Sequence, residues 1–139
     1  MDIVHHTLIG GAGFIVLAAN DHELAGMAFV AGSVIPDLDV IFMAFGKRFY
    51  LSNHQGPTHS LFLSPLIALL IALPLSPLGF SWVVYCAALL GLLLHVFLDL
   101  ANTYGITLFW PIRRDRWSLD SVFFIDAITW ALTAAFYIQ

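Results

Sequence analysis

Histidine and aspartate side chains lie inside, or at the margins of, long apolar runs in this chain. Ionisable groups placed against hydrocarbon are costly, so they need either partners or a function. Imidazole and carboxylate together form the donor set that is typical of zinc sites in proteins. Seven such residues are therefore candidate metal ligands: His6, Asp37, Asp39, His54, His59, His95 and Asp99.

His95 and Asp99 form the most regular pair in this set. Their i,i+4 spacing places both side chains on one face of a helix, about 6 Å apart. That separation suits two ligands of one metal ion, or one ligand and the carboxylate that orients it. A hydrogen bond that satisfies two buried polar groups explains the pair equally well. Asn102 extends the same polar face, and we expect it beside the ligands or the substrate.

His54 and His59 flank a Gly56-Pro57 pair, which predicts a turn. A ligand on the loop and a ligand at the start of the following helix can converge on one ion. The alternative is one surface histidine and one histidine that merely begins a helix.

Asp37 and Asp39 follow Pro36, which disfavours helix before it and interrupts an existing helix. If the backbone is extended there, both carboxylates point to the same side. Two neighbouring carboxylates repel each other unless a cation lies between them. We therefore expect a catalytic role for both, as bridging ligands or as a ligand and a general base. A helix cap would explain one aspartate but not both.

Three further residues, and His6 among the seven, are weaker candidates. His5 and His6 point in different directions on a helix, and the favoured ligand is His6. Asp126 lies well inside the last apolar segment, so we expect it to face the interior near the ligands. Arg113 and Arg114 are candidate contacts for a substrate phosphate.

The elements that carry these residues are strongly apolar. The chain has 139 residues, of which 60% are hydrophobic and 10% charged, against about 25% charged in an ordinary soluble domain. Its net charge is -4, and no basic block is present, so nucleic-acid binding is excluded. The composition predicts one integral-membrane helical domain over residues 1–139.

Apolar segments approach the roughly 20 residues that a membrane-spanning helix needs. We predict an all-α, polytopic membrane helix bundle of four to five transmembrane segments, in which the second segment is broken at Pro36. The turn 76–79 separates the third and fourth segments by its proline and glycine. The predicted segments are about 5–20, 24–45, 58–78, 80–102 and 119–138.

Basic residues predict the orientation in the membrane. All five occur in two loops, Lys47–Arg48 and 113–116. The positive-inside rule places both loops in the cytoplasm, so the N-terminus is expected to be cytoplasmic. In this topology all seven candidate ligands fall in the same layer, near the cytoplasmic face.

Seven donors are too many for one Zn²⁺, which takes four ligands. They suit one or two ions, Zn²⁺ first and Mn²⁺ as the alternative, and two-metal sites are typical of phosphoester and amide hydrolysis. The expected function is metal-dependent hydrolysis of a membrane lipid or lipid-linked phosphoester by an activated water. The alternatives are a metal or proton transporter, or a non-catalytic membrane protein with a structural metal.

The order of these motifs resembles a known family. An N-terminal His precedes 32-GSVIPDLD-39, then 54-HQGPTHS-60, then His95-x-x-Leu98-Asp99 and Trp110-Pro111. This pattern is similar to the YdjM/YbcI-like bacterial inner-membrane proteins described as metal-dependent hydrolases, and in part to zinc-dependent phospholipase C. The resemblance implies a helical membrane hydrolase that uses the His and Asp positions named above. Gln55 stands where that family usually has Arg, which removes one phosphate contact.

Overall fold

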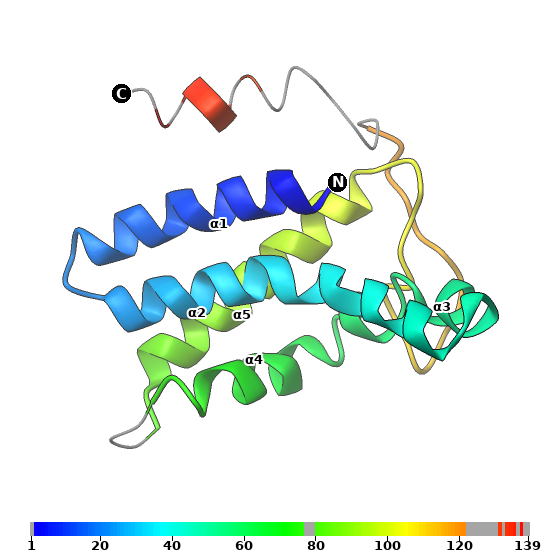
Figure 1. The fold of residues 1–139 in the computed structure, drawn as a ribbon, viewed down its shortest axis with the longest axis horizontal. Helices are drawn as coiled ribbons and strands as arrows, with labels where there is room; N and C mark the ends of the chain where they lie inside the picture. Colours follow the sequence, from blue (N-terminus) through cyan, green and yellow to red (C-terminus); the bar gives the residue numbers. More distant parts are fainter. Residues whose placement is uncertain (1, 77–79, 122–130, 132, 136, 138–139) are drawn as a thin grey trace.

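The chain folds as a bundle of helices in a computed structural model that describes residues 2–76, 80–121, 131, 133–135 and 137 (Figure 1). Within these residues there is no β-strand, so the prediction of an all-helical fold is confirmed. The α-helices are α1 (Ile3–Ala18), α2 (Glu23–Val34), α3 (Lys47–Asn53), α4 (Ser64–Ala72) and α5 (Trp82–Leu100). Two 3-10 helices join them, η1 (Ile35–Phe45) and η2 (Pro57–His59).

Helix α2 lies at the centre of the bundle and contacts α1, α4 and α5. Small residues let α2 and α5 approach closely, as in helix pairs within a bilayer. A Cβ added at Gly32 would collide with the Ala88 carbonyl oxygen, and one added at Gly91 would collide with that of Phe29. The core between α2, α4 and α5 is built mainly from alanine and aliphatic side chains: Ala25, Ala28, Ala68, Ile71, Ala72, Val84, Ala87, Ala88 and Leu92.

The predicted break in the second segment coincides with a change of helix type. Helix α2 ends at Val34 and continues directly as η1, with Pro36 in its first turn, where a missing N–H costs nothing. The backbone is therefore helical at this point, and the condition under which both carboxylates would point to the same side is not met. A 3-10 helix has three residues per turn, so side chains two positions apart, such as Asp37 and Asp39, point about 120° away from each other.

The prediction of four to five membrane spans is not confirmed. Among the described residues, two helical stretches are long and apolar enough to cross a membrane, Glu23–Phe45 and Trp82–Leu100. A third is counted if Lys47–His59 and Ser64–Ala72, which meet at a bend of 80°, form one span. Helix α1 has 16 residues and reaches only about 24 Å at roughly 1.5 Å per residue. The predicted segment 119–138 falls largely outside the described residues.

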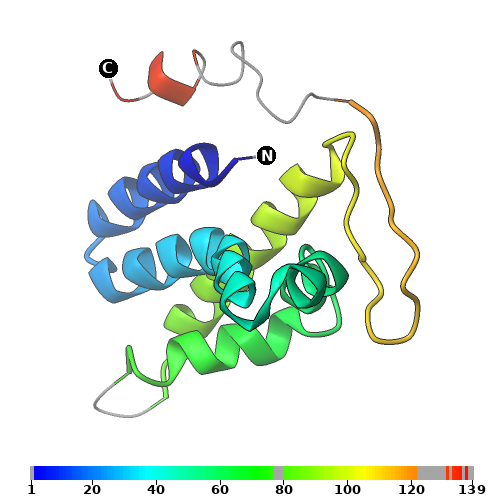
Figure 2. The ribbon, with the colours of Figure 1, turned by 45° about the vertical axis from the view of Figure 1, so that its right-hand side comes forward.

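After α5 the chain runs outward and returns as one loop over residues 101–121 (Figure 2). A β-bridge between Ile106 and Trp117 closes this loop. The Thr107 amide donates to the Gln55 carbonyl at 3.1 Å, and the Leu61 amide donates to the Leu108 carbonyl at 3.0 Å. These bonds tie the loop to the segment around η2, so both basic loops lie at the same end of the bundle.

Candidate metal centre

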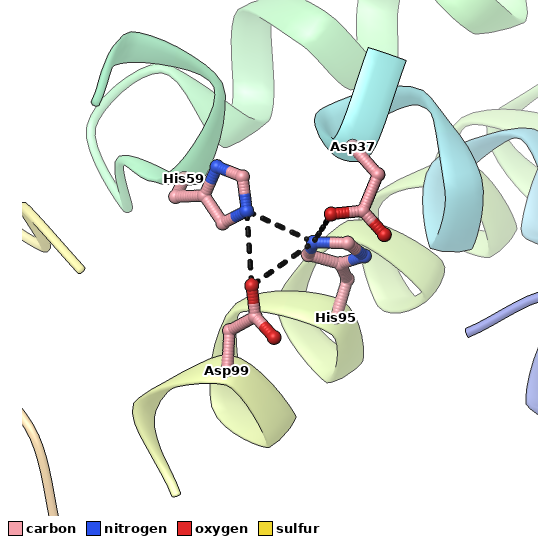
Figure 3. Close-up of side chains that lie close together, drawn as sticks. All are labelled: Asp37, His59, His95 and Asp99. Atoms are coloured by element: carbon pink, nitrogen blue, oxygen red, sulfur yellow. Dashed lines mark hydrogen bonds and ion pairs between the residues drawn. The ribbon is translucent and has the colours of Figure 1, made fainter. Parts of the chain in front are cut away.

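Four of the predicted ligands converge at the end of the bundle where α5 finishes. Asp37 comes from η1, His59 from η2, and His95 and Asp99 from the last turns of α5 (Figure 3). One donor atom of each lies within 4.8 Å of the donors of the other three. We call these four residues the quartet.

The separations within the quartet are those of ligands around a small cation. His59 Nε2 lies 3.0 Å from Asp99 Oδ2 and 3.1 Å from His95 Nε2. His95 Nε2 lies 3.6 Å from Asp99 Oδ2 and 3.7 Å from Asp37 Oδ1. Ligands held about 2.0–2.2 Å from a tetrahedral Zn²⁺ are roughly 3.3–3.6 Å apart. Small adjustments would therefore bring these atoms to a common ion.

Neighbouring groups fix which nitrogen of each imidazole faces the quartet. His95 Nδ1 lies 2.7 Å from the Ser33 carbonyl oxygen, which can only accept a hydrogen bond, so Nδ1 carries the proton. The His95 Nε2 lone pair is then directed at the quartet, as a metal ligand requires. His59 Nδ1 lies 3.0 Å from Thr58 Oγ1, whose hydroxyl can accept the equivalent bond.

His6 lies against the quartet from the side of α1. Its Nε2 is 3.1 Å from Asp99 Oδ1, and its ring stacks on that of His95 with centroids 3.8 Å apart. Asp2 caps α1 by accepting from the Val4 amide, which helps to hold this first turn in place. The structure therefore places His6 next to Asp99 and outside the quartet.

Burial tests whether these residues suit a metal. His59, His95 and Asp99 are each at most 1% exposed, in a setting where a charge without a partner is very costly. Asp37 Oδ2 is buried and has no hydrogen-bond partner among the described residues. A divalent cation held between the four residues would offset the charge of the Asp37 and Asp99 carboxylates. The donors of the quartet could thus hold a divalent metal ion.

Asp39 and His54 form a separate pair. Asp39 Oδ1 lies 2.9 Å from His54 Nδ1, and Asp39 Oδ2 accepts from the Gln55 amide at 2.8 Å. Asp39 is buried, whereas the His54 side chain is 27% exposed and stacks on Tyr50. The structure does not bring this pair into the quartet, because η1 turns Asp37 and Asp39 in different directions.

The remaining predicted residues are dispersed. Asn102 is buried, and its Oδ1 accepts from the Tyr104 amide at 3.2 Å. Arg113 is exposed and pairs with Asp115 at 3.3 Å. Arg114 lines a small polar cavity beside His54. Asp126 lies outside the described residues.

Sequence reasoning missed two residues that organise this end of the molecule. Ser33 orients His95 through its backbone carbonyl, which no side-chain pattern announces. Arg116 donates to the carbonyls of Gly105 and His54, at 3.0 and 3.1 Å, and to Gln55 Oε1 at 3.1 Å. The sequence offered one signal for Arg116, because it stands in the same basic loop as Arg113 and Arg114.

Comparisons with known proteins confirm the resemblance to the YdjM inner-membrane proteins. The model of the family described as "YdjM inner membrane protein" matches residues 1–139. The chain is also 34% identical over 97 residues to the "Uncharacterized protein YfhP" of Bacillus subtilis (strain 168). That match covers 66% of this chain but only 28% of YfhP. No solved structure matches the chain.

Proposed function

The chain belongs to the YdjM family of inner membrane proteins, and on this premise we propose that it is a membrane-embedded, metal-dependent hydrolase. Its substrate is a membrane lipid or a lipid-linked phosphoester. The observation that carries the proposal is the convergence of Asp37, His59, His95 and Asp99 on one point. Imidazole and carboxylate donors in this arrangement are typical of hydrolytic zinc sites.

The quartet would hold Zn²⁺, or Mn²⁺ as the alternative, and His6 would orient Asp99 from outside. When bound, the metal would lower the pKa of a water to about 7 and polarise the P=O group of the substrate. A second metal ion would require Asp39 and His54 as additional ligands.

Asp37 is the residue we assign to proton transfer. Its Oδ1 faces His95, while its Oδ2 has no hydrogen-bond partner among the described residues. Its side chain is 14% exposed, the largest value in the quartet. We assign to this unpaired oxygen the proton that an attacking water would lose. Asp39 is a positioning residue, since it holds His54 and the Gln55 amide.

The site is assigned to the cytoplasmic side of the membrane, with a cytoplasmic N-terminus. Support comes from the basic loops, because Arg116 contacts the His54 carbonyl at the same end of the bundle as the quartet. A lipid substrate follows from this depth, since its phosphoester lies at the interface. Transport is disfavoured, because Ala72, Val84 and Ala88 fill the other end of the bundle, where an ion path needs polar groups.

A structural metal is the second candidate function. Four protein donors make a closed tetrahedral site, whereas catalytic zinc keeps one position open for water. The exposure of Asp37 distinguishes a catalytic metal from a structural one. A ligand that a water molecule replaces must lie at the edge of the site.

Metal analysis of the purified full chain tests the centre directly. We expect about one equivalent of metal in the wild type and a loss of most of it in His59→Ala and Asp99→Ala. His22→Ala is the matched control, because this exposed histidine lies in the α1–α2 turn, away from the quartet. Unchanged metal content in both quartet variants would exclude the site.

Turnover separates an enzyme from a structural metal protein. Phospholipids and phosphoester lipids are presented in mixed micelles to the metal-loaded protein, before and after chelation. A hydrolase loses turnover on chelation, and Asp37→Asn lowers kcat by 10²–10⁴-fold, as expected for removal of a general base. If no lipid is cleaved while chelation unfolds the protein, the metal is structural.

A further inference from the structure

A small polar cavity lies beside the Asp39–His54 pair, on the side of His54 that faces the 101–121 loop. Its volume is about 150 Å³. Sites that enclose a drug-sized ligand measure roughly 300–1,000 Å³, so this cavity accommodates one small group. The residues that matter here are Asn53, His54, Thr107, Trp110, Arg114 and Arg116.

Arg116 is held rigidly at this cavity. Its guanidinium donates to Gln55 Oε1, to the Gly105 carbonyl and to the His54 carbonyl, and it lies 5.8 Å from the Tyr104 ring centroid. Three of the five N–H donors of a guanidinium are thereby used. The two that remain have no protein acceptor among the described residues. A fixed guanidinium with spare donors is suited to a phosphate or carboxylate.

Arg114 adds a second positive charge at the same cavity. It lines the cavity and forms no ion pair among the described residues, whereas the neighbouring Arg113 pairs with Asp115 and does not line it. No carboxylate is among the described residues that line the cavity. The two arginines therefore place positive charge on this space, and the nearby carboxylate of Asp39 is engaged with His54 and the Gln55 amide.

His54 completes the lining from the opposite wall. Asp39 Oδ1 binds its Nδ1 at 2.9 Å, and the ring stacks on Tyr50 at a centroid distance of 4.6 Å. These two contacts fix the imidazole plane and leave Nε2 for a ligand. A phosphate oxygen in the cavity can accept hydrogen bonds from the two arginines.

We infer that this cavity is a subsite for a phosphate group, carried either by a lipid head group or by free phosphate. The inference rests on the proposed function, because it assigns to the Arg114–Arg116 cavity a phosphate group of the substrate other than the phosphoester that is cleaved at the quartet. The chain links the two, since only Leu38 separates Asp37 from Asp39 and Gly56 lies three residues before His59.

Titration calorimetry on the detergent-solubilised full chain tests the subsite. The probes are inorganic phosphate and dihexanoyl phosphatidic acid, used in separate titrations. We expect Arg114→Gln to weaken binding of a probe at least fivefold, because it removes a charge without breaking any side-chain bond of the fold. Arg113→Gln is the matched control and should change binding less than twofold. Arg116→Lys, which keeps the charge but not the planar fork, should weaken binding as well.

The two arms identify the source of the phosphate. Arginine-dependent binding of the lipid supports the inference with a head group as ligand, and arginine-dependent binding of inorganic phosphate alone supports it with free phosphate. Equal binding by Arg114→Gln and wild type overturns it. Measuring the metal-deficient Asp99→Ala protein separates this inference from the proposed function. If Asp99→Ala still binds phosphate and Arg114→Gln does not, the subsite is supported. If Asp99→Ala loses phosphate binding and Arg114→Gln retains it, phosphate binds at the metal, and only the subsite inference is overturned.

Discussion

Gly32→Ala is expected to weaken the metal centre although Gly32 binds nothing. The added methyl group would collide with the Ala88 carbonyl oxygen and lie 3.0 Å from the Leu92 amide nitrogen on α5. Both neighbours are backbone atoms, which cannot rotate away as a side chain can. Helices α2 and α5 must therefore separate at this point.

The added distance between α2 and α5 can be compared with the length of the hydrogen bond that orients His95. Ordinary contacts of a Cβ begin at 3.4 Å, so the Leu92 nitrogen alone demands about 0.4 Å, and the Ala88 oxygen demands more. Ser33, the next residue on α2, accepts from His95 Nδ1 at 2.7 Å. If the distance between His95 Nδ1 and the Ser33 carbonyl oxygen grows by the same 0.4 Å, it reaches about 3.1 Å or more, which is the weak end of the N–H···O range.

Gly32→Ala should therefore lower both the metal affinity and the free energy of unfolding. Loss of the group that orients a ligand histidine typically lowers metal affinity 10–100-fold, which corresponds to about 1.4–2.7 kcal/mol. Overpacking of the helix interface costs a further 1–3 kcal/mol or so of unfolding free energy. The metal affinity is measured by competition with a chromophoric chelator, and the stability by thermal unfolding of the apo protein in detergent.

Gly13→Ala is the matched control for this substitution. It adds the same methyl group to another helix, but the new Cβ would meet only the ring of Phe29, a side chain. We expect some loss of stability and less than a twofold change in metal affinity. If Gly32→Ala binds metal as tightly as the wild type, the proposed dependence of His95 on the α2–α5 distance is refuted.

Three further outcomes are expected. Asp39→Asn weakens the bond to His54 and should lower the unfolding free energy by about 1–3 kcal/mol, without loss of metal; metal loss equal to that of Asp99→Ala would contradict the separation of the two clusters. Chelation should lower the unfolding temperature of the wild type but not of Asp99→Ala, because a ligand at 100 times its Kd stabilises the folded state by about 2.7 kcal/mol. An equal shift in the wild type and in Asp99→Ala argues against a metal at the quartet. Asp2→Ala should cost about 1 kcal/mol through the lost cap of α1, and bound metal should persist because His6 lies outside the quartet.

The helical fold could be predicted because it rests on local signals. Runs of apolar residues gave segments 24–45 and 80–102, close to Glu23–Phe45 and Trp82–Leu100. The predicted number of spans was not confirmed within the described residues, because hydropathy extends across residues that are not helical there. The predicted segment 58–78 contains η2, a connection and the nine-residue α4, where Pro57 and Pro65 limit the helix to short pieces.

The candidate site could be predicted in its residue types but not in its grouping. The spacing of His95 and Asp99 fixes their common face within a single helix, and the structure places both in the quartet. The grouping of His59 with Asp37, and of His54 with Asp39, depends on contacts between elements far apart in sequence. Arg116 likewise reaches Gln55 across 61 positions, and no local pattern encodes such a contact.

The backbone after Pro36 explains why two aspartates of one motif serve two clusters. In an extended strand, Asp37 and Asp39 would share a side, and their charges would require one common cation. The 3-10 helix η1 instead directs Asp37 to His95 and Asp39 to His54. Each carboxylate then meets an imidazole, and repulsion between them falls with distance. The same short rigid element therefore fixes the quartet relative to the arginine-lined cavity, so a shift of η1 would alter both together.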